Sequence, residues 1–99
     1  MSEPRAYTEE EVREILLRTI RHLSIYWANQ PNLSNQERTD GMAFSILNIF
    51  DGTTMGLPVM DIVLCPHPDD KEFNIKNGDN YFEEGMMINN CHLHSMYYK

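Results

Sequence analysis

The stretch FSILNIFDGTTMG (residues 44–56) and the run LPVMDIVLC (residues 57–65) directly after it decide the fold of this chain. The first ends an apolar helix at Asp51 and Gly52, where a glycine can adopt the left-handed conformation that closes a helix. The second is rich in β-branched and apolar residues, which is typical of a strand. The chain therefore passes from a helix through a tight turn into a strand, and we expect the remaining segments to pack onto this unit.

Local signals predict two helices in the first half of the chain. Thr8 with Glu11, and Ser34 with Glu37, have the spacing of capping boxes, in which each side chain bonds the backbone N–H of the other residue. Apolar residues then recur at steps of three and four. We predict helices over residues 8–29 and 35–51, joined by a short connection that makes them an antiparallel hairpin. Gly41 would allow the two helices to approach closely.

The predicted fold class is α+β, an antiparallel helical hairpin packed on a short strand or small sheet, with an irregular C-terminal third. The strand covers residues 59–65 and ends where Pro66 and Pro68 prevent further ladder pairing. Because it is apolar on both faces except at Asp61, we expect it to be covered on both sides or to lie at an interface. Beyond it, Asp69 is expected to cap a helical turn, and a short helix is predicted within residues 90–98.

Composition and charge exclude several classes of protein. Ninety-nine residues, 41% of them hydrophobic and 23% charged, make a single folded domain over residues 1–99, with a flexible tail over residues 1–7. The formal net charge of −7 and the lack of a basic stripe disfavour nucleic-acid binding. The polar N-terminus and the lack of a long apolar run predict no membrane partner and a cytoplasmic location, where Cys65 and Cys91 stay as thiols.

The run IVLCPHPDD (residues 62–70) carries the most suggestive chemistry. It resembles the strand-then-PHPDD signature of the N-acetylglucosaminyl deacetylase family of zinc enzymes. The resemblance implies that His67 and Asp70 bind zinc and that Asp69 acts as a general base on bound water. Lys71 stands where that family has an acidic residue, and 29 residues remain after Asp70. The other interpretation is a proline-rich exit from the strand.

Further histidines allow a second version of a metal site. His92 and His94, with Cys91, could join His67, since a zinc site needs three or four converging ligands. Hydrogen-bonded or surface histidines are the alternative interpretation. Cys65 and His67 would share a strand face, but the pair lacks an orienting group. The sequence therefore predicts no cofactor and assigns no catalytic residue.

A broader resemblance rests on residues spread along the chain: Tyr26-Trp27-Ala28, Gly41, residues 43–47 (AFSIL), Asp51-Gly52, residues 66–71 (PHPDDK), residues 78–80 (GDN) and Leu93-His94. In these the chain resembles a group of small uncharacterised proteins carried by phages and prophages of enteric bacteria. The resemblance covers about residues 8–96 and implies no established activity.

The predicted function is that of a non-enzymatic accessory or regulatory protein acting through protein–protein contacts. We expect a homodimer and an unidentified protein partner, with an interface that includes Val59, Val63, Tyr26 and Trp27. The seven methionines suit either an irregular core or an adaptable contact surface. The alternative is a small metal-binding protein or metal-dependent hydrolase centred on the PHPDD segment.

Overall fold

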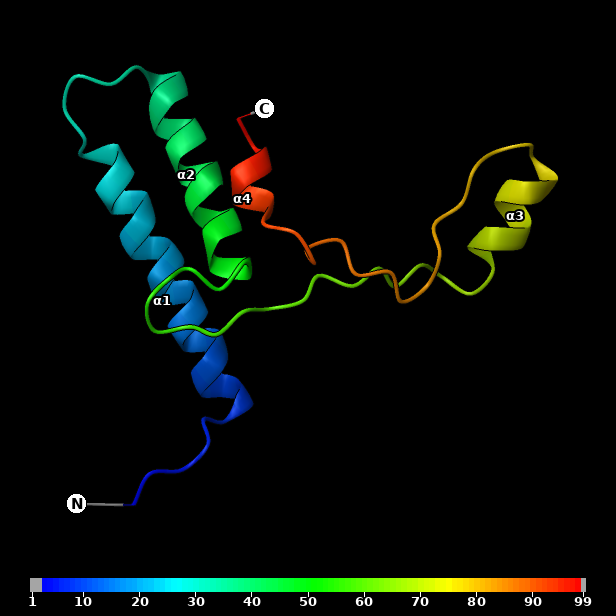
Figure 1. Ribbon diagram of the computed structural model, residues 1–99, viewed down its shortest axis with the longest axis horizontal. Coiled ribbons are helices and arrows are strands. Elements are labelled where there is room, and N and C mark those ends of the chain that lie inside the picture. The colour runs from blue at the N-terminus through cyan, green and yellow to red at the C-terminus, as the bar shows by residue number, and fades with distance from the viewer. Residues whose placement is uncertain (1–2, 99) are drawn as a thin grey trace.

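The computed structural model describes residues 3–98, which form four helices (Figure 1). They are α1 (Glu9–Ala28), α2 (Asn35–Phe50), α3 (Asp70–Lys76) and α4 (Leu93–Met96). Helix α2 lies between α1 and α4 and packs against both, whereas α3 stands apart at the far end of two extended segments. Of the predicted tail, residues 1–2 lie outside the described residues.

Both long helices begin at the predicted capping boxes. Thr8 Oγ1 accepts a hydrogen bond from the backbone N–H of Glu11 at 3.2 Å, and Glu11 Oε1 accepts one from the N–H of Thr8 at 2.8 Å. Ser34 and Glu37 make the same pair of bonds at the start of α2. Each pair satisfies backbone donors that the first turn of a helix leaves open. The predicted helix positions are therefore confirmed to within one or two residues.

Close packing at Gly41 joins the two helices into the predicted antiparallel hairpin. Gly41 is buried, and a Cβ atom on it would lie 2.5 Å from the indole ring of Trp27. The same indole donates from Nε1 to Ser45 Oγ at 2.9 Å. Across the turn, Arg38 Nη2 donates to the Gln30 carbonyl at 2.8 Å. The absence of a side chain at Gly41 is what lets Trp27 pack between the helices.

The predicted turn after α2 is also present. Gly52 has a φ of +80°, the left-handed conformation expected of the residue that ends the helix. The chain then reverses, and the N–H of Met60 bonds the carbonyl of Phe50 at 3.0 Å. A Cβ atom on Gly52 would lie 2.8 Å from Val59 Cβ. The turn therefore needs glycine both for its conformation and for its close contact.

The predicted α+β class is wrong, because the structure is 49% helix and 2% strand, with no sheet in residues 3–98. Residues 59–65 are extended, but they pair only through an isolated antiparallel bridge between Val63 and Met87. Pro58 and Pro66 lack the N–H that a ladder needs at either end of this run. Helix-on-helix packing takes the place of the expected packing of helices on a sheet.

The molecule is elongated and has a small core. Its radius of gyration is 18.0 Å, against about 13 Å for a compact domain of this length. Among residues 3–98, the buried hydrophobic side chains are those of Ile49 and Leu57. No helix in that part of the chain combines the length and apolar character that a membrane crossing needs.

Candidate interaction surface

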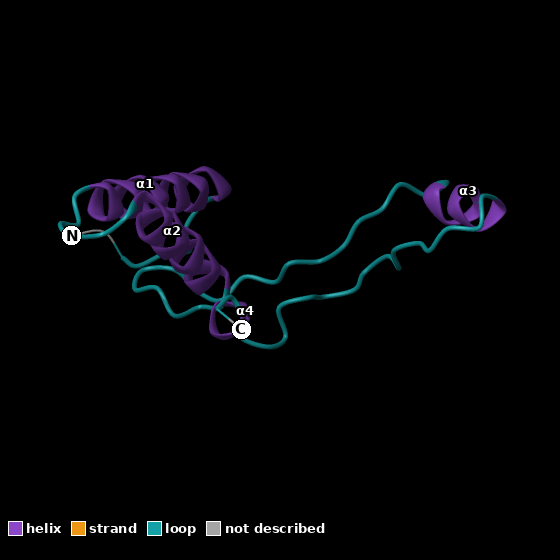
Figure 2. Cartoon of the chain, turned by 90° about the horizontal axis from the view of Figure 1, so that it is seen from above, coloured by secondary structure: helices purple, strands orange, loops and turns teal. Residues whose placement is uncertain are grey.

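Residues 58–92 leave the helices as a long projection, here called the arm. Its two extended segments run side by side in both views, and α3 forms its tip (Figures 1 and 2). Backbone bonds join the segments: Leu64 N–H to the Met86 carbonyl at 2.9 Å, and Gly85 N–H to the Leu64 carbonyl at 2.9 Å. Ile88 N–H bonds the Ile62 carbonyl at 3.0 Å. The arm is thus a narrow two-stranded ribbon with irregular pairing.

The side chain of Asn89 fixes the base of the arm. Asn89 is buried, and its Oδ1 accepts from the N–H of Ile62 at 2.8 Å. Its Nδ2 donates to the carbonyls of Met60 and, at the end of α2, Phe50. The amide thus fills the place that a backbone peptide of the opposite segment would occupy. Because such buried bonds are costly to leave unmade, they set the direction in which the arm leaves α2.

A buried pair formed by Asp51 and His94 ties α4 to the end of α2. Asp51 Oδ2 accepts from the backbone N–H of His94 at 2.8 Å, and His94 Nδ1 lies 2.6 Å from the same oxygen. Because an ionised carboxylate only accepts, the ring donates through Nδ1. The His94 ring also packs edge-on against Phe44. The chain is therefore anchored on both sides of the arm.

The pKa of the Asp51 carboxyl lies below its ordinary value. Burial acts to raise this pKa, but the hydrogen bonds from the backbone and ring of His94, and from the backbone of Leu93, outweigh burial. The other oxygen, Oδ1, is buried without a hydrogen-bond partner among the described residues. Asp51 is therefore held as a carboxylate by His94.

The arm itself exposes a large amount of apolar surface. Side chains alternate between the two faces of an extended segment, so Val63 and Met87 share one face while Met86 and Ile88 lie on the other. Val63 is 45% exposed, and Phe82, beside the tip, is 72% exposed. The full set of exposed large apolar residues on the arm is Val59, Val63, Phe73, Ile75, Tyr81, Phe82, Met86, Met87 and Ile88. A ribbon that is apolar on both faces and covered on neither is typical of an interaction surface.

The helices expose a second apolar strip, the outer face of α1. Leu17 and Ile25 are eight residues apart and lie on one side of the helix. They are 59% and 55% exposed. Arg18 and Arg21 flank Leu17 in an open groove of ≈ 350 Å³, which Glu10, Arg13 and Glu14 also line. Neither Arg18 nor Arg21 forms an ion pair within residues 3–98.

The four residues predicted at an interface fall in two places. Val59 and Val63 lie exposed on the arm, and Tyr26 is exposed near the end of α1. Trp27 instead packs inside the hairpin against Gly41. The prediction thus names two residues of the arm, whereas Tyr26 lies off the strip of Leu17 and Ile25 and Trp27 has a structural role between the helices.

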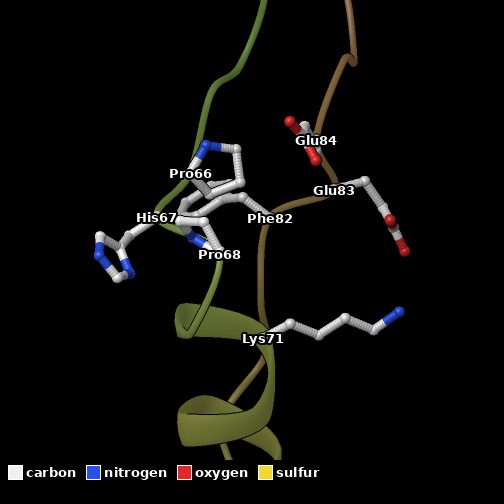
Figure 3. A pocket seen from close by; sticks show the side chains of 7 residues that line it. All are labelled: Pro66, His67, Pro68, Lys71, Phe82, Glu83 and Glu84. Carbon is white, nitrogen blue, oxygen red and sulfur yellow. The ribbon is translucent and has the colours of Figure 1, made fainter.

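The PHPDD segment lies where the arm meets α3. It borders an open hollow of ≈ 220 Å³ lined by Pro66, His67, Pro68, Lys71, Phe82, Glu83 and Glu84 (Figure 3). His67 points away from the Lys71 and Glu83 side of this hollow. Its Nδ1 accepts from the N–H of Asp69 at 3.1 Å. Asp69 stands at the N-cap position of α3 but makes no side-chain cap bond, so its predicted capping role is wrong.

The candidate metal ligands do not converge. Asp70 begins α3 and His67 precedes it, whereas His92 is the N-cap of α4 and His94 lies within α4; α3 and α4 are far apart in both views (Figures 1 and 2). His92 and His94 stack with their ring centroids 5.3 Å apart. Within residues 3–98, no three His, Cys, Asp or Glu side chains are grouped as a metal site requires. Cys65 and Cys91 are exposed thiols.

Asp51, His94 and Ser95 form a hydrogen-bonded line in the order used by serine hydrolases. Ser95 Oγ lies 3.4 Å from His94 Nε2, beyond the 2.6–3.2 Å range of a working nucleophile and base. Ser95 also follows His94 directly and sits inside the four-residue helix α4. We therefore assign this line the structural role of anchoring α4.

Sequence reasoning missed the two residues that fix the base of the arm. In the sequence Asp51 marks only the end of a helix, and Asn89 belongs to no recognisable motif. Asp51 had one available signal, since a polar residue that ends an apolar helix must find partners if it is buried. Asn89 follows an apolar run and carries no local signal of its bonds to residues 27 to 39 positions away.

Comparison of the chain with protein-family models, with curated proteins and with solved structures finds no match.

Proposed function

We propose that this chain is a non-enzymatic interaction protein that works as a homodimer in the cytoplasm. Its role would be that of an accessory or regulatory factor acting through protein–protein contacts. The resemblance to small phage and prophage proteins suggests that further partners be sought in infected or lysogenic cells. The exposed apolar surface of the arm supports a role in binding.

One observation carries this proposal, the excess of exposed surface. The chain exposes 8138 Å², whereas a compact monomer of its mass exposes about 5,800 Å². The excess of about 2,300 Å² per chain includes polar and apolar surface, and the exposed apolar residues of the arm contribute to it. Covered in a two-fold dimer, it would amount to about 4,600 Å² in total, within the range of obligate homodimers. Two-fold dimers are the commonest way in which small proteins cover such a surface.

Light scattering at micromolar concentration tests the proposal. We expect a mass twice the 11.6 kDa of one chain. Val63→Lys places a charge on the exposed arm and should disrupt the dimer more than Glu84→Lys, which changes a residue that is already polar and exposed. A wild-type mass of one chain would overturn the proposal.

A further inference from the structure

We propose that the dimer forms by reciprocal exchange of arms, with the arm of each copy lying across the outer face of α1 in the other. This inference rests on the proposed homodimer and adds its geometry. Each chain carries both halves of the contact, an apolar arm and the strip of α1 around Leu17 and Ile25. The proposal commits to a second copy of this chain as the occupant of both surfaces.

The base of the arm explains why one chain does not cover its own helix. Asn89 and the Asp51–His94 pair hold the two ends of the arm beside the end of α2. From there the arm runs away from α1, and α3 lies far from the hairpin in both views (Figures 1 and 2). An element held away from the surface that it could cover is free to reach the same surface on another copy, as in domain-swapped dimers.

The arm is acidic, whereas the outer face of α1 carries a small excess of positive charge. Residues 58–92 carry seven acidic residues against two lysines, a net charge of −5. The groove around Leu17 is lined by Arg13, Arg18 and Arg21 together with Glu10 and Glu14, and beyond Glu14 the helix has no acidic residue up to its end at Ala28. Such opposite charges favour an arm-to-helix contact over an arm-to-arm contact, in which like charges would meet.

The surface that arm exchange would cover is also large enough for a stable dimer. Exchange buries each arm and each α1 strip once, so both exposed surfaces of a chain are covered in one closed pair. The excess of about 2,300 Å² per chain is thereby covered without a further partner. A two-fold axis makes the two contacts identical and stops growth beyond the dimer.

A complementation experiment on the full chain tests this arrangement. One variant, Val63→Lys, damages only the arm, and the other, Leu17→Glu, damages only the outer face of α1. Each alone should raise the dissociation constant of the dimer by about tenfold or more, as substitutions at the centre of an interface do. Mixed together, they retain one intact arm-to-helix contact, so light scattering should show a heterodimer. Thr39→Glu, at an exposed position of α2, is the matched control and should leave the dimer intact.

The outcomes separate the two proposals. A monomeric wild type overturns the homodimer and arm exchange together. If the wild type is a dimer and the Leu17→Glu variant dimerises as well, arm exchange is overturned and arm-to-arm pairing becomes the explanation of the dimer. Loss of association in both variants without rescue in the mixture also overturns it. Because Leu17 and Val63 are exposed in the single chain, circular dichroism should show unchanged helix content in both variants.

Discussion

Gly41 shows how one residue controls the approach of two helices. In an exposed helix, Gly→Ala gains about 1 kcal/mol of stability from helix propensity. At Gly41 the added Cβ would lie 2.5 Å from the ring of Trp27. We expect Gly41→Ala to destabilise the protein by about 1–3 kcal/mol, as overpacking of a filled site does. Urea unfolding measures the change.

Thr39→Ala is the control for this prediction. Thr39 is exposed in the same helix, so its replacement also gains helix propensity but creates no clash. A Gly41→Ala protein as stable as the Thr39→Ala control would show that Trp27 can move aside at little cost.

The Asp51–His94 pair makes stability depend on pH. The folded-state pKa of Asp51 lies below its ordinary value of 3.8, so the folded protein binds fewer protons than the unfolded chain as the pH falls. The pair therefore stabilises the fold above that value, and its contribution is lost as the pH falls through the folded-state pKa. We expect Asp51→Asn to cost about 1–3 kcal/mol at neutral pH. The difference from wild type should shrink on acidification, as urea unfolding across the pH range would measure.

Asp79 supplies the comparison for Asp51. It is exposed, so Asp79→Asn should leave the free energy of unfolding almost unchanged at every pH. A constant difference between wild type and Asp51→Asn from neutral to acid pH would contradict the assigned role of His94.

At the scale of elements, the arm depends on Asn89 for its direction. Asn89→Ala removes the acceptor of the Ile62 N–H and the donor to the Met60 carbonyl. We expect the amide of Ile62 to exchange its hydrogen at least about tenfold faster, since a lost bond of this kind is worth roughly 1–3 kcal/mol. Hydrogen exchange followed by NMR measures this directly.

The neighbouring Asn90 provides a matched variant, because it has the same side chain but is exposed. Asn90→Ala should leave the exchange of Ile62 unchanged. Equal exchange rates of the Ile62 amide in the two variants would show that Asn89 does not hold the base of the arm.

At the scale of the whole molecule, the small core predicts that folding and association are linked. A chain whose buried hydrophobic side chains in residues 3–98 are those of Ile49 and Leu57 gains little stability alone. We expect the melting temperature of the wild type to rise by a few degrees for each tenfold increase in concentration, because association stabilises the folded state by mass action. At a given concentration Val63→Lys should melt at a lower temperature than the wild type, and a wild type that melted at one temperature at all concentrations would contradict this link.

The helices could be predicted from sequence because their signals are local. The capping boxes of Thr8 and Ser34 act within three residues, and the hairpin follows from the short connection between α1 and α2. The depth of burial is not a local property: within α2, Ile49 is fully buried, whereas Ile46, one turn earlier, is only partly buried. Burial depends on which neighbours arrive from distant parts of the chain.

The sequence by itself determined the two long helices, the turn at Gly52 and the apolar character of residues 59–65. Only the tertiary structure decided that this run extends into an arm and that no sheet forms in residues 3–98. The reason is that a strand needs a partner along its length. Here the pairing is limited to the bridge between Val63 and Met87 and the few backbone hydrogen bonds around it, and the side chain of Asn89 replaces the backbone beyond it. A local pattern specifies an extended, apolar segment, but distant residues decide what that segment packs against.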